Sequence, residues 1–367
     1  MKKQLPGLKK HIRLNIISMM ILLTAVCSFL WSGLSHSSPA PQLKPFPDTH
    51  WEKATSTEML GYSSGVLDKA REYTKNLKTA AVMIIVDGII LAEWGDSAKK
   101  FNVHSIRKSF LSALYGITIK EGRINLSWTL KQLGIDDNEP SLTEEEKKAT
   151  VRQLLQARSG IYHPALYESL GMKARRPERG SHAPGTFFYY NNWDFNTLGT
   201  IFRNLTRTDL YREFKRRIAD PIGMEDFEAS DGYYFTGKDS VHPAYPFFMT
   251  ARDMARFGLL YLRNGAWKGV QIIPEYWVKE STTAFSNAGS TGGYGYMWWV
   301  SVDGRHLPGV SLEDGAYSAR GAGGHYILII PSYDMVIVHR VNTFIAGNRV
   351  TDAEFGGLVK MILEAKL

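Results

Sequence analysis

Residues 101–121 read FNVHSIRKSFLSALYGITIKE, and this stretch decides how the chain can fold. Apolar side chains recur in it at intervals of three and four residues, which is the spacing of one helix face. They are Ile106, Phe110, Ala113, Leu114 and Ile117. The β-prone residues 101–103 come before Ser105. We therefore expect a buried helix that begins at Ser105 and around which the other elements are organised.

Ser105 and Lys108 are three residues apart, so their side chains share one face of this helix. Burial lowers the pKa of a lysine, and a neutral amine beside a hydroxyl can make a serine nucleophilic. The alternative is an ordinary helix cap followed by a surface lysine. Ser97 and Lys100 have the same spacing, but they lie in the polar run GDSAKK, for which we expect a solvated loop.

The composition is that of a globular protein with ample core: 367 residues, of which 44% are hydrophobic and 22% charged. The formal net charge is +8, but five of these charges lie before residue 14, and the remaining chain carries only +3. This small net charge argues against the extended basic surface of a nucleic-acid-binding protein.

The basic start is followed by an apolar run at residues 14–34, which predicts a signal peptide or a single membrane anchor within residues 1–36. The positive flank would stay in the cytoplasm, so we expect export, with the protein periplasmic or attached to the membrane facing the periplasm. A Pro/Ser-rich linker is expected at residues 37–50, and one domain at residues 51–367. Cys27 lies in the apolar run, so the exported part has no thiol.

Apolar and β-prone runs predict strands at both ends of the domain and helices between them. We expect a hairpin at residues 80–94 around Asp87-Gly88, and strands at 294–302, 324–330 and 335–341. Helices are expected at residues 64–77, 144–157, 196–214, 250–264 and 353–367. The fold class would be α+β. An antiparallel sheet from both chain ends would carry the terminal helices on one face and a mostly helical insertion, about residues 123–287, on the other.

A second chemical candidate lies in residues 185–199, GTFFYYNNWDFNTLG. Tyr190 and Asn192 form a Tyr-x-Asn triplet, and Tyr189 with Asn191 forms another, so spacing leaves the register open. A tyrosine near a lysine can have a lowered pKa and pass a proton to a leaving group. Asn192 could hydrogen-bond the lysine and a substrate carbonyl. The alternative is an aromatic packing loop.

A glycine-rich run, residues 320–325 (RGAGGH), leads into a predicted strand. An acyl oxyanion needs two aimed N–H donors, and bare glycines let a substrate lie against the backbone. The alternative for this run is a bulge or a bend.

Two other patterns are weaker candidates. Residues 61–65, GYSSG, match G-x-S-x-G, but a nucleophile elbow needs a buried strand before it and a buried helix after it. Ser63 or Ser64 is therefore expected to cap a helix. The ten histidines have no metal-ligand spacing, so we expect no metal and no cofactor. His104 adjoins Ser105, and adjacent helical residues do not face each other. We therefore expect His104 to contact the catalytic residues and not the substrate.

The segment HSIRKSFLSALYG resembles the nucleophile helix of the serine β-lactamase superfamily, in the class C β-lactamase/esterase branch that includes 6-aminohexanoate-dimer hydrolase. Seven further blocks are similar to family blocks and occur in the family's order, over about residues 60–365. They are EGRINL, VRQLLQARSGI, PGTFFYYNNWDFNTLG, ADPIGMED, TARDMARFGLLYLRNGAWKGVQIIPEYWV, GYGYMWWV and ARGAGGHYILIIPSYDMVIV.

The resemblance implies a β-lactamase/transpeptidase-like fold and assigns roles to residues. It selects Ser105 as the nucleophile, with Lys108 and Tyr190 moving the proton, and Asn192 in the site. It implies oxyanion donors at the backbone N–H groups of Ser105 and His325, with Gly323 and Gly324 against the substrate. The aligned third-motif triplet, residues 322–324 (AGG), lacks the cation and hydroxyl that hold a β-lactam carboxylate. Arg320 or His325 would have to supply the cation.

We therefore expect an exported serine hydrolase that cleaves a small ester or amide through an acyl-enzyme. One alternative is a D,D-carboxypeptidase or β-lactamase that acts on cell-wall peptides or penicillins. Another is a catalytically silent binding or sensor protein on the same fold. Expected partners are a small-molecule substrate and the membrane at the N-terminal segment, without nucleic acid. Trp193, Trp298 and Trp299 would lie either in the cleft or in the core.

Overall fold

A computed structural model describes residues 45–367. The predicted signal peptide or anchor and most of the predicted linker lie outside the described residues. The part of the linker that is described packs on the domain: the ring of Phe46 lies 4.9 Å from that of Trp267, and the carbonyl of Asp48 accepts a hydrogen bond from Arg256. Among residues 45–367, no helix is long and apolar enough to cross a membrane.

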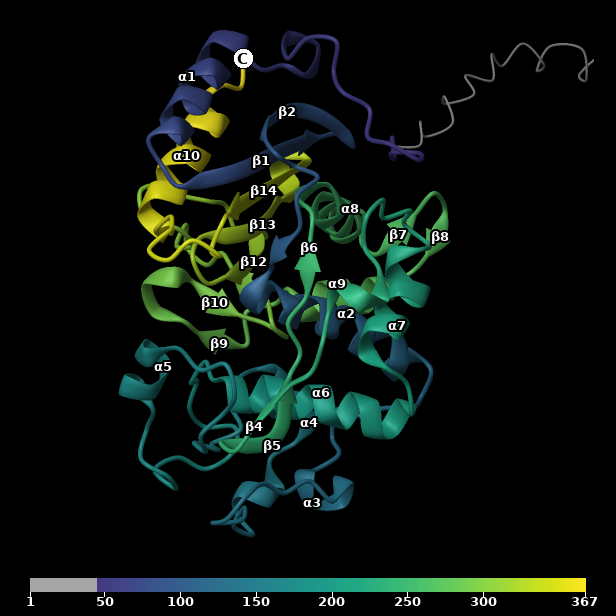
Figure 1. The fold of residues 1–367 in the computed structure, drawn as a ribbon, viewed down its shortest axis with the longest axis vertical. Helices are drawn as coiled ribbons and strands as arrows, with labels where there is room; N and C mark the ends of the chain where they lie inside the picture. Colours follow the sequence, from purple (N-terminus) through teal and green to yellow (C-terminus); the bar gives the residue numbers. More distant parts are fainter. Residues whose placement is uncertain (1–44) are drawn as a thin grey trace, which may run out of the picture. The chain divides into compact units, whose positions relative to one another are not determined.

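The centre of the fold is an eight-stranded antiparallel sheet in the order β2-β1-β14-β13-β12-β11-β10-β9 (Figure 1). The strands are β1 (Thr79–Val86), β2 (Ile89–Gly95), β9 (Ser286–Asn287), β10 (Gly293–Tyr294), β11 (Trp299–Val300), β12 (Tyr317–Gly321), β13 (His325–Ile330) and β14 (Met335–Val341). β1 pairs with β14, so the two ends of the domain meet in the sheet. The expected α+β class and antiparallel sheet are confirmed. The predicted β1–β2 hairpin turns at Asp87 and Gly88, which both have positive φ.

One face of the sheet is covered by α1 (Ser64–Lys75) and α10 (Asp352–Glu364), as predicted for the terminal helices (Figure 1). Their apolar stripes pack on the outer-facing side chains of β1, β13 and β14. The buried cluster includes Leu67, Ile84, Leu328, Leu358 and Ile362. Ser63 caps α1 by accepting a hydrogen bond from the N–H of Val66. The serine in the GYSSG pattern is thus a helix cap, as expected.

On the other face, α8 (Ala251–Leu262) packs on β13 and β14, with Gly258 against Ile327 and Val336. α2 (Arg107–Lys120) runs beside α8, with the ring of Phe110 4.8 Å from that of Phe257, between the sheet and the helical region (Figure 1). The β-prone residues before Ser105 form a short strand, β3 (Phe101–Asn102), and the helix predicted to begin at Ser105 starts as a 3-10 turn, His104–Ile106. Every residue of α2 from Arg107 to Thr118 is buried. Periodicity predicted only one apolar face, whereas this helix is enclosed on all sides, because small residues such as Gly116 admit neighbours on its other faces.

The remaining elements form the helical region and three small two-stranded sheets. The helices are α3 (Leu130–Leu133), α4 (Val151–Leu155), α5 (Leu170–Arg175), α6 (Asn192–Thr206), α7 (Leu210–Phe214), α8 (Ala251–Leu262) and α9 (Glu275–Ser281). β3 pairs with β6 (Phe248–Met249), β4 (Phe235–Gly237) with β5 (Ser240–Ala244), and β7 (Ala266–Trp267) with β8 (Val270–Gln271).

Three predicted elements are interrupted in the structure. The helix expected at 144–157 is broken before Thr150, which caps α4 in a capping box with Gln153. The helix expected at 196–214 stops at Arg207, whose φ of 56° ends α6. The strand expected at 294–302 is two short strands, β10 and β11, with Met297 at a φ of 63° between them. In each case local turn or cap chemistry overrides the longer periodic pattern.

Candidate active site

Three side chains predicted from the sequence meet at the start of α2. The amine nitrogen of Lys108 lies 2.7 Å from the hydroxyl oxygen of Ser105 and 2.7 Å from that of Tyr190. Lys108 is 1% exposed, whereas Ser105 and Tyr190 are partly exposed. Tyr190 comes from the loop before α6, where Asn191 caps the helix by accepting from the N–H of Asp194 at 2.9 Å.

Within residues 45–367, the hydrogen-bond partners of the Lys108 nitrogen are two hydroxyls and no carboxylate. Burial, with a smaller contribution from the neighbouring Arg107 guanidinium, lowers the pKa of the Lys108 amine well below its ordinary value. The nitrogen also lies over the rings of Tyr190 and Phe195, at 4.5 and 4.8 Å from their centroids. The ring faces would attract a charged amine, but burial dominates and favours a neutral amine that can accept a proton.

Tyr190 differs from the sequence-based expectation of a lowered pKa. Burial raises the pKa of Tyr190 to about 12, although its hydrogen bond with Ser105 and the charges of Arg107 and Arg320 act in the opposite direction. The side chain is therefore a neutral phenol at physiological pH. A neutral phenol can still relay a proton, because it donates one hydrogen and accepts another.

His104 holds the turn that presents Ser105. Its φ is 49°, and its backbone N–H donates to the side-chain oxygen of Asn102 at 2.8 Å. Its Nε2 lies 2.8 Å from the hydroxyl of Thr343, in the loop after β14. Burial, followed by the charges of Arg340, Lys108 and Arg107, lowers the pKa of His104 to about 4, so the ring is neutral. His104 thus ties the Ser105 turn to the end of the sheet.

A cavity of about 300 Å³ opens beside Ser105. It is lined by His104, Ser105, Arg107, Tyr167, Ser169, Met172, Tyr190, Asn192, Thr291, Trp299, Arg320, Gly321, Ala322, Tyr326 and Asp352. Asn192 lines it, but within residues 45–367 it makes no hydrogen bond to Lys108, contrary to the expectation. Its amide nitrogen donates to the carbonyl of Tyr167 at 2.5 Å, and its buried oxygen has no partner within the described part of the chain. That oxygen is left as an acceptor.

The structure does not bring Gly323, Gly324 and His325 to this cavity. The two glycines form the turn between β12 and β13, with φ of 89° and 98°, and His325 begins β13. A Cβ on Gly324 would lie 2.6 Å from the carbonyl oxygen of Val350. The alternative of a backbone bend therefore describes these glycines better than substrate contact. The residues of this run that line the cavity are Arg320, Gly321 and Ala322.

Of the two candidates for the third-motif cation, Arg320 lines the cavity and His325 does not. The Arg320 side chain donates to the hydroxyl of Ser318 at 3.0 Å and to the carbonyl of His306 at 2.8 Å, and it lies 3.8 Å from Asp352. His325 is fully buried and accepts from Arg340 at 3.0 Å, and burial lowers the pKa of its imidazole far below the usual range.

Sequence reasoning missed two charged residues of the cavity. Arg107 donates to Asn196 at 3.0 Å, while its second terminal nitrogen is buried without a partner in the described chain. Its position next to Lys108 in the sequence could have indicated that it lies near the site. The sequence around Asp352, the first residue of α10, does not indicate that it lies in the cavity, because only the tertiary fold brings it there. Trp299 lines the cavity, whereas Trp193 and Trp298 are buried in the core.

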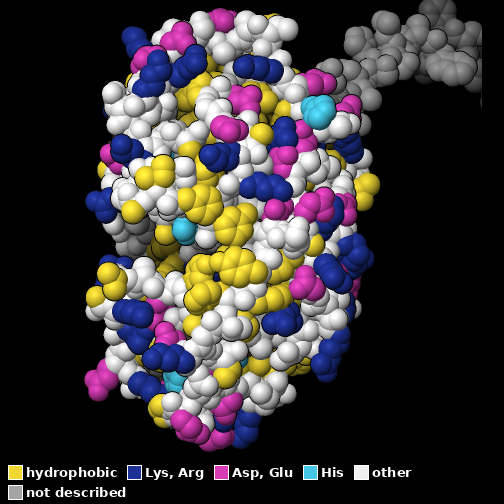
Figure 2. Space-filling model, viewed as in Figure 1, with side chains coloured by type: hydrophobic (Ala, Val, Ile, Leu, Met, Phe, Trp, Pro, Cys, Tyr) yellow, Lys and Arg dark blue, Asp and Glu magenta, His cyan; other side chains and the backbone are white. Residues whose placement is uncertain are grey.

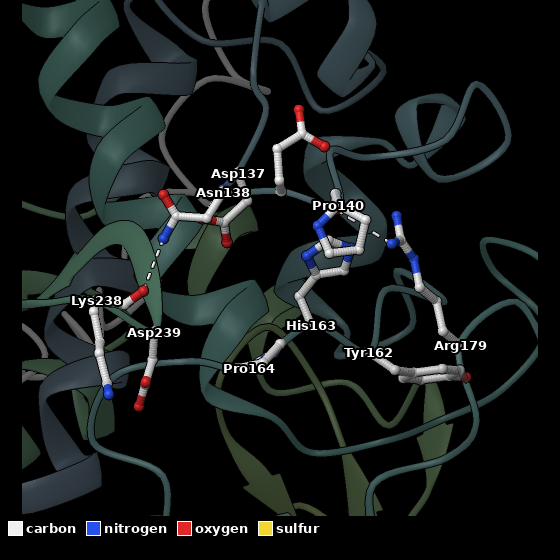
Figure 3. Close-up of a pocket in the computed structure, with 10 residues that line it drawn as sticks. Asp137, Asn138, Pro140, Tyr162, His163, Pro164, Arg179, Lys238 and Asp239 are labelled. Carbon is white, nitrogen blue, oxygen red and sulfur yellow. Dashed lines mark hydrogen bonds between the residues drawn. The ribbon is translucent and has the colours of Figure 1, made fainter.

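A second cavity, also of about 300 Å³, lies around Tyr162 and His163 (Figure 3). Arg179, at its edge, donates to the carbonyl of Pro140 and pairs with Glu146 at 2.7 Å. None of its lining residues is shared with the Ser105 cavity, and none is a serine or cysteine. Among residues 45–367 no group of side chains could hold a metal ion.

Comparisons with known proteins agree with this geometry. The Beta-lactamase family model matches residues 41–359. The fold is similar to that of a putative 6-aminohexanoate-dimer hydrolase from Bacillus anthracis, at 24% identity and a TM-score of 0.63, covering 88% of each chain. It is also similar to a beta-lactamase/D-alanine carboxypeptidase from Pseudomonas syringae, at 17% identity and a TM-score of 0.61, covering 84% of this chain and 98% of that one.

Among curated proteins, an uncharacterized protein of Alkalihalophilus pseudofirmus is 22% identical over 313 residues, which span 72% of this chain and 84% of the relative. The family model covers most of the domain, including the Ser105 turn and the Tyr190 loop. The chain belongs to the beta-lactamase family of serine hydrolases.

Proposed function

We propose that the protein hydrolyses a small ester or amide through an acyl-enzyme on Ser105. The observation that carries this proposal is the position of a single buried amine, Lys108, 2.7 Å from both the Ser105 and the Tyr190 hydroxyls. A nucleophile, a base and a proton relay in direct contact are the parts that acyl transfer needs. Residues 14–34 support the further proposal that this chemistry takes place outside the cytoplasm.

In acylation, the oxygen of Ser105 bonds to the substrate's carbonyl carbon while its proton moves to the neutral Lys108 amine. Tyr190 takes this proton on and passes one to the leaving oxygen or nitrogen, so the departing alcohol or amine is neutral. In deacylation, water attacks the acyl carbon and gives its proton to the same pair, and Ser105 regains its hydrogen. The burial of Lys108 supports its role as the base in both steps.

The developing oxyanion requires two N–H donors. We assign them to the backbone of Ser105 and of Ala322, in place of the sequence-based choice of His325. Ala322 directly follows the last residue of β12 and lines the cavity with Ser105, whereas His325 does not.

The test is a Ser105→Ala variant assayed with a panel of chromogenic short-chain esters and anilides. We expect a loss of at least about a thousandfold in kcat/KM. Ser97→Ala is the matched control, because Lys100, three residues on, forms an ion pair with Asp231 at 2.6 Å instead. Mass spectrometry should find an acyl adduct on Ser105. Undiminished hydrolysis by Ser105→Ala would overturn the proposal.

Arg320 favours one second candidate, a D,D-carboxypeptidase or β-lactamase, because a cation in the cavity could hold a substrate carboxylate. Labelling of Ser105 by a fluorescent penicillin would promote this candidate, and absence of labelling would leave the ester or amide substrate first. A fluorophosphonate probe addresses a silent binding protein, since a site without an activated serine would not react.

A further inference from the structure

A strip of aromatic side chains lies on the surface beside the Ser105 cavity. We call Tyr167, Tyr233, Phe235, Phe248 and Phe344 the aromatic strip. Tyr233 is 47% exposed and Phe344 63% exposed, while Phe248 between them is partly buried. Figure 2 shows hydrophobic side chains gathered over β6 in the middle of this face. A contiguous exposed apolar surface on a soluble domain usually marks a binding site.

The rings of the strip contact one another in sequence. Phe344 stacks on Phe248 with centroids 6.2 Å apart and an interplanar angle of 8°, and Phe248 stacks on Tyr233 at 6.2 Å and 22°. The hydroxyls of Tyr233 and Tyr167 are 3.1 Å apart, and Tyr167 meets Phe235 edge to face at 5.0 Å. Because the members touch, they form one continuous surface of uncharged side chains.

The strip is connected to the Ser105 turn or its cavity at three points. Tyr167 is itself a lining residue of the Ser105 cavity. Phe248 lies on β6, opposite Asn102 of β3, the strand that leads into Ser105. At the other end, Thr343, the residue before Phe344, is hydrogen-bonded to His104. The cavity and the strip are therefore parts of one surface.

We propose that the aromatic strip binds an extended, uncharged apolar chain of the substrate, so that the enzyme favours medium-chain acyl esters or amides over acetyl ones. This inference rests on the proposed function. A cavity of about 300 Å³ holds the reacting group and a short chain, and a longer chain would continue over the neighbouring rings. An unbranched chain suits a row of several rings, because each added methylene finds another apolar contact.

The test compares kcat/KM for 4-nitrophenyl octanoate with that for the acetate ester on the same enzyme preparation. The ratio is the readout, because any loss of folded enzyme cancels from it. We expect the octanoate to acetate ratio to fall roughly fivefold in Phe344→Ser and in Tyr233→Ser, mainly through KM for octanoate. Tyr276→Ser is the matched control, since Tyr276 is 49% exposed on α9, outside both the strip and the cavity.

A ratio that is the same in the wild type and in all three variants would overturn the inference while leaving the proposed function standing. No hydrolysis of either ester by the wild type would instead count against the proposed function, and the inference would fall with it. Sedimentation velocity of the same variants tests whether the strip instead contacts a second copy of this chain. If Phe344→Ser dissociates an oligomer without changing the ratio, the strip is a contact between copies of this chain, and the inference is wrong.

Discussion

The two faces of the central sheet are built differently. On the outer face, α1 and α10 bury side chains such as Leu67, Leu358 and Ile362, which are apolar. On the inner face, α2 is surrounded by protein and still buries Lys108 and Arg107. Arg107 leaves one buried nitrogen without a partner in the described chain.

This contrast separates stability from chemistry. Apolar burial stabilises the outer layer at little electrostatic cost, whereas each buried polar group of the inner layer costs stability unless it is fully hydrogen-bonded. The inner layer keeps these buried polar groups beside Ser105. The separation is incomplete, because Asp352 at the start of α10 reaches the cavity. Four measurements test this difference between the two layers.

Lys108→Met should give the largest effect and should move activity and stability in opposite directions. We expect kcat/KM to fall by at least about a thousandfold, since the base is lost. The buried amine binds fewer protons in the folded than in the unfolded chain, so it costs stability at every pH below its unfolded pKa. Removing it should therefore raise the free energy of unfolding, by about 1 kcal/mol. Urea unfolding at neutral pH measures this, and a strongly destabilised variant would contradict the comparison.

Ile362→Ala should lower the stability of the fold and leave the activity nearly unchanged. Ile362 is fully buried against the outer face, far along α10 from Asp352. Truncation should cost about 3 kcal/mol of unfolding free energy through lost burial and a residual cavity. The kcat/KM of the folded fraction should stay within a factor of two of wild type. A large change in kcat/KM with an unchanged denaturation midpoint would show that the outer layer also shapes the site.

The pH dependence of kcat/KM should report the protonation states of the buried groups on the inner face of the sheet. Because the base must be neutral, activity should fall by about tenfold per pH unit below the lowered pKa of Lys108 and level off above it. The upper limb should appear only as Tyr190 ionises, near its pKa of about 12. His104, with a pKa of about 4, should not shape the profile near neutrality. Activity that decreases with rising pH between about 6 and 9 would refute a neutral-amine base.

Ser63→Ala should give the smallest effect. This serine matches a nucleophile pattern in the sequence, but in the structure it caps α1. Its loss should lower the free energy of unfolding by about 1 kcal/mol, because one N–H of the first turn loses its acceptor. The rate of ester hydrolysis should not change. Thermal unfolding and the chromogenic assay check both parts, and a loss of hydrolysis without a change in stability would make Ser63 a site residue.

Many elements of the fold could be predicted from local sequence patterns. The predictions that were wrong also failed at local features of the backbone. The β1–β2 hairpin was readable from Asp87-Gly88, which adopts the positive φ that this turn needs. The helix predicted at 196–214 is interrupted because Arg207 adopts a left-handed conformation, which periodicity does not reveal. β12 was not predicted as a strand. Without it, the glycine run was placed against the substrate, although Gly323 and Gly324 form the turn that follows β12.

The amino-acid sequence was enough to identify the reactive groups and the sheet: a serine and a lysine one helical turn apart, a Tyr-x-Asn triplet, and strands near both chain ends that need partners. These are properties of short segments, where spacing fixes which side chains share a face. The three-dimensional fold was needed to show that Arg320 lines the cavity and His325 does not, that Asp352 joins it, and that Tyr190 is a neutral phenol. The reason is physical, because burial and long-range contacts set both the pKa and the direction of a side chain, and neither is encoded in its neighbours along the chain.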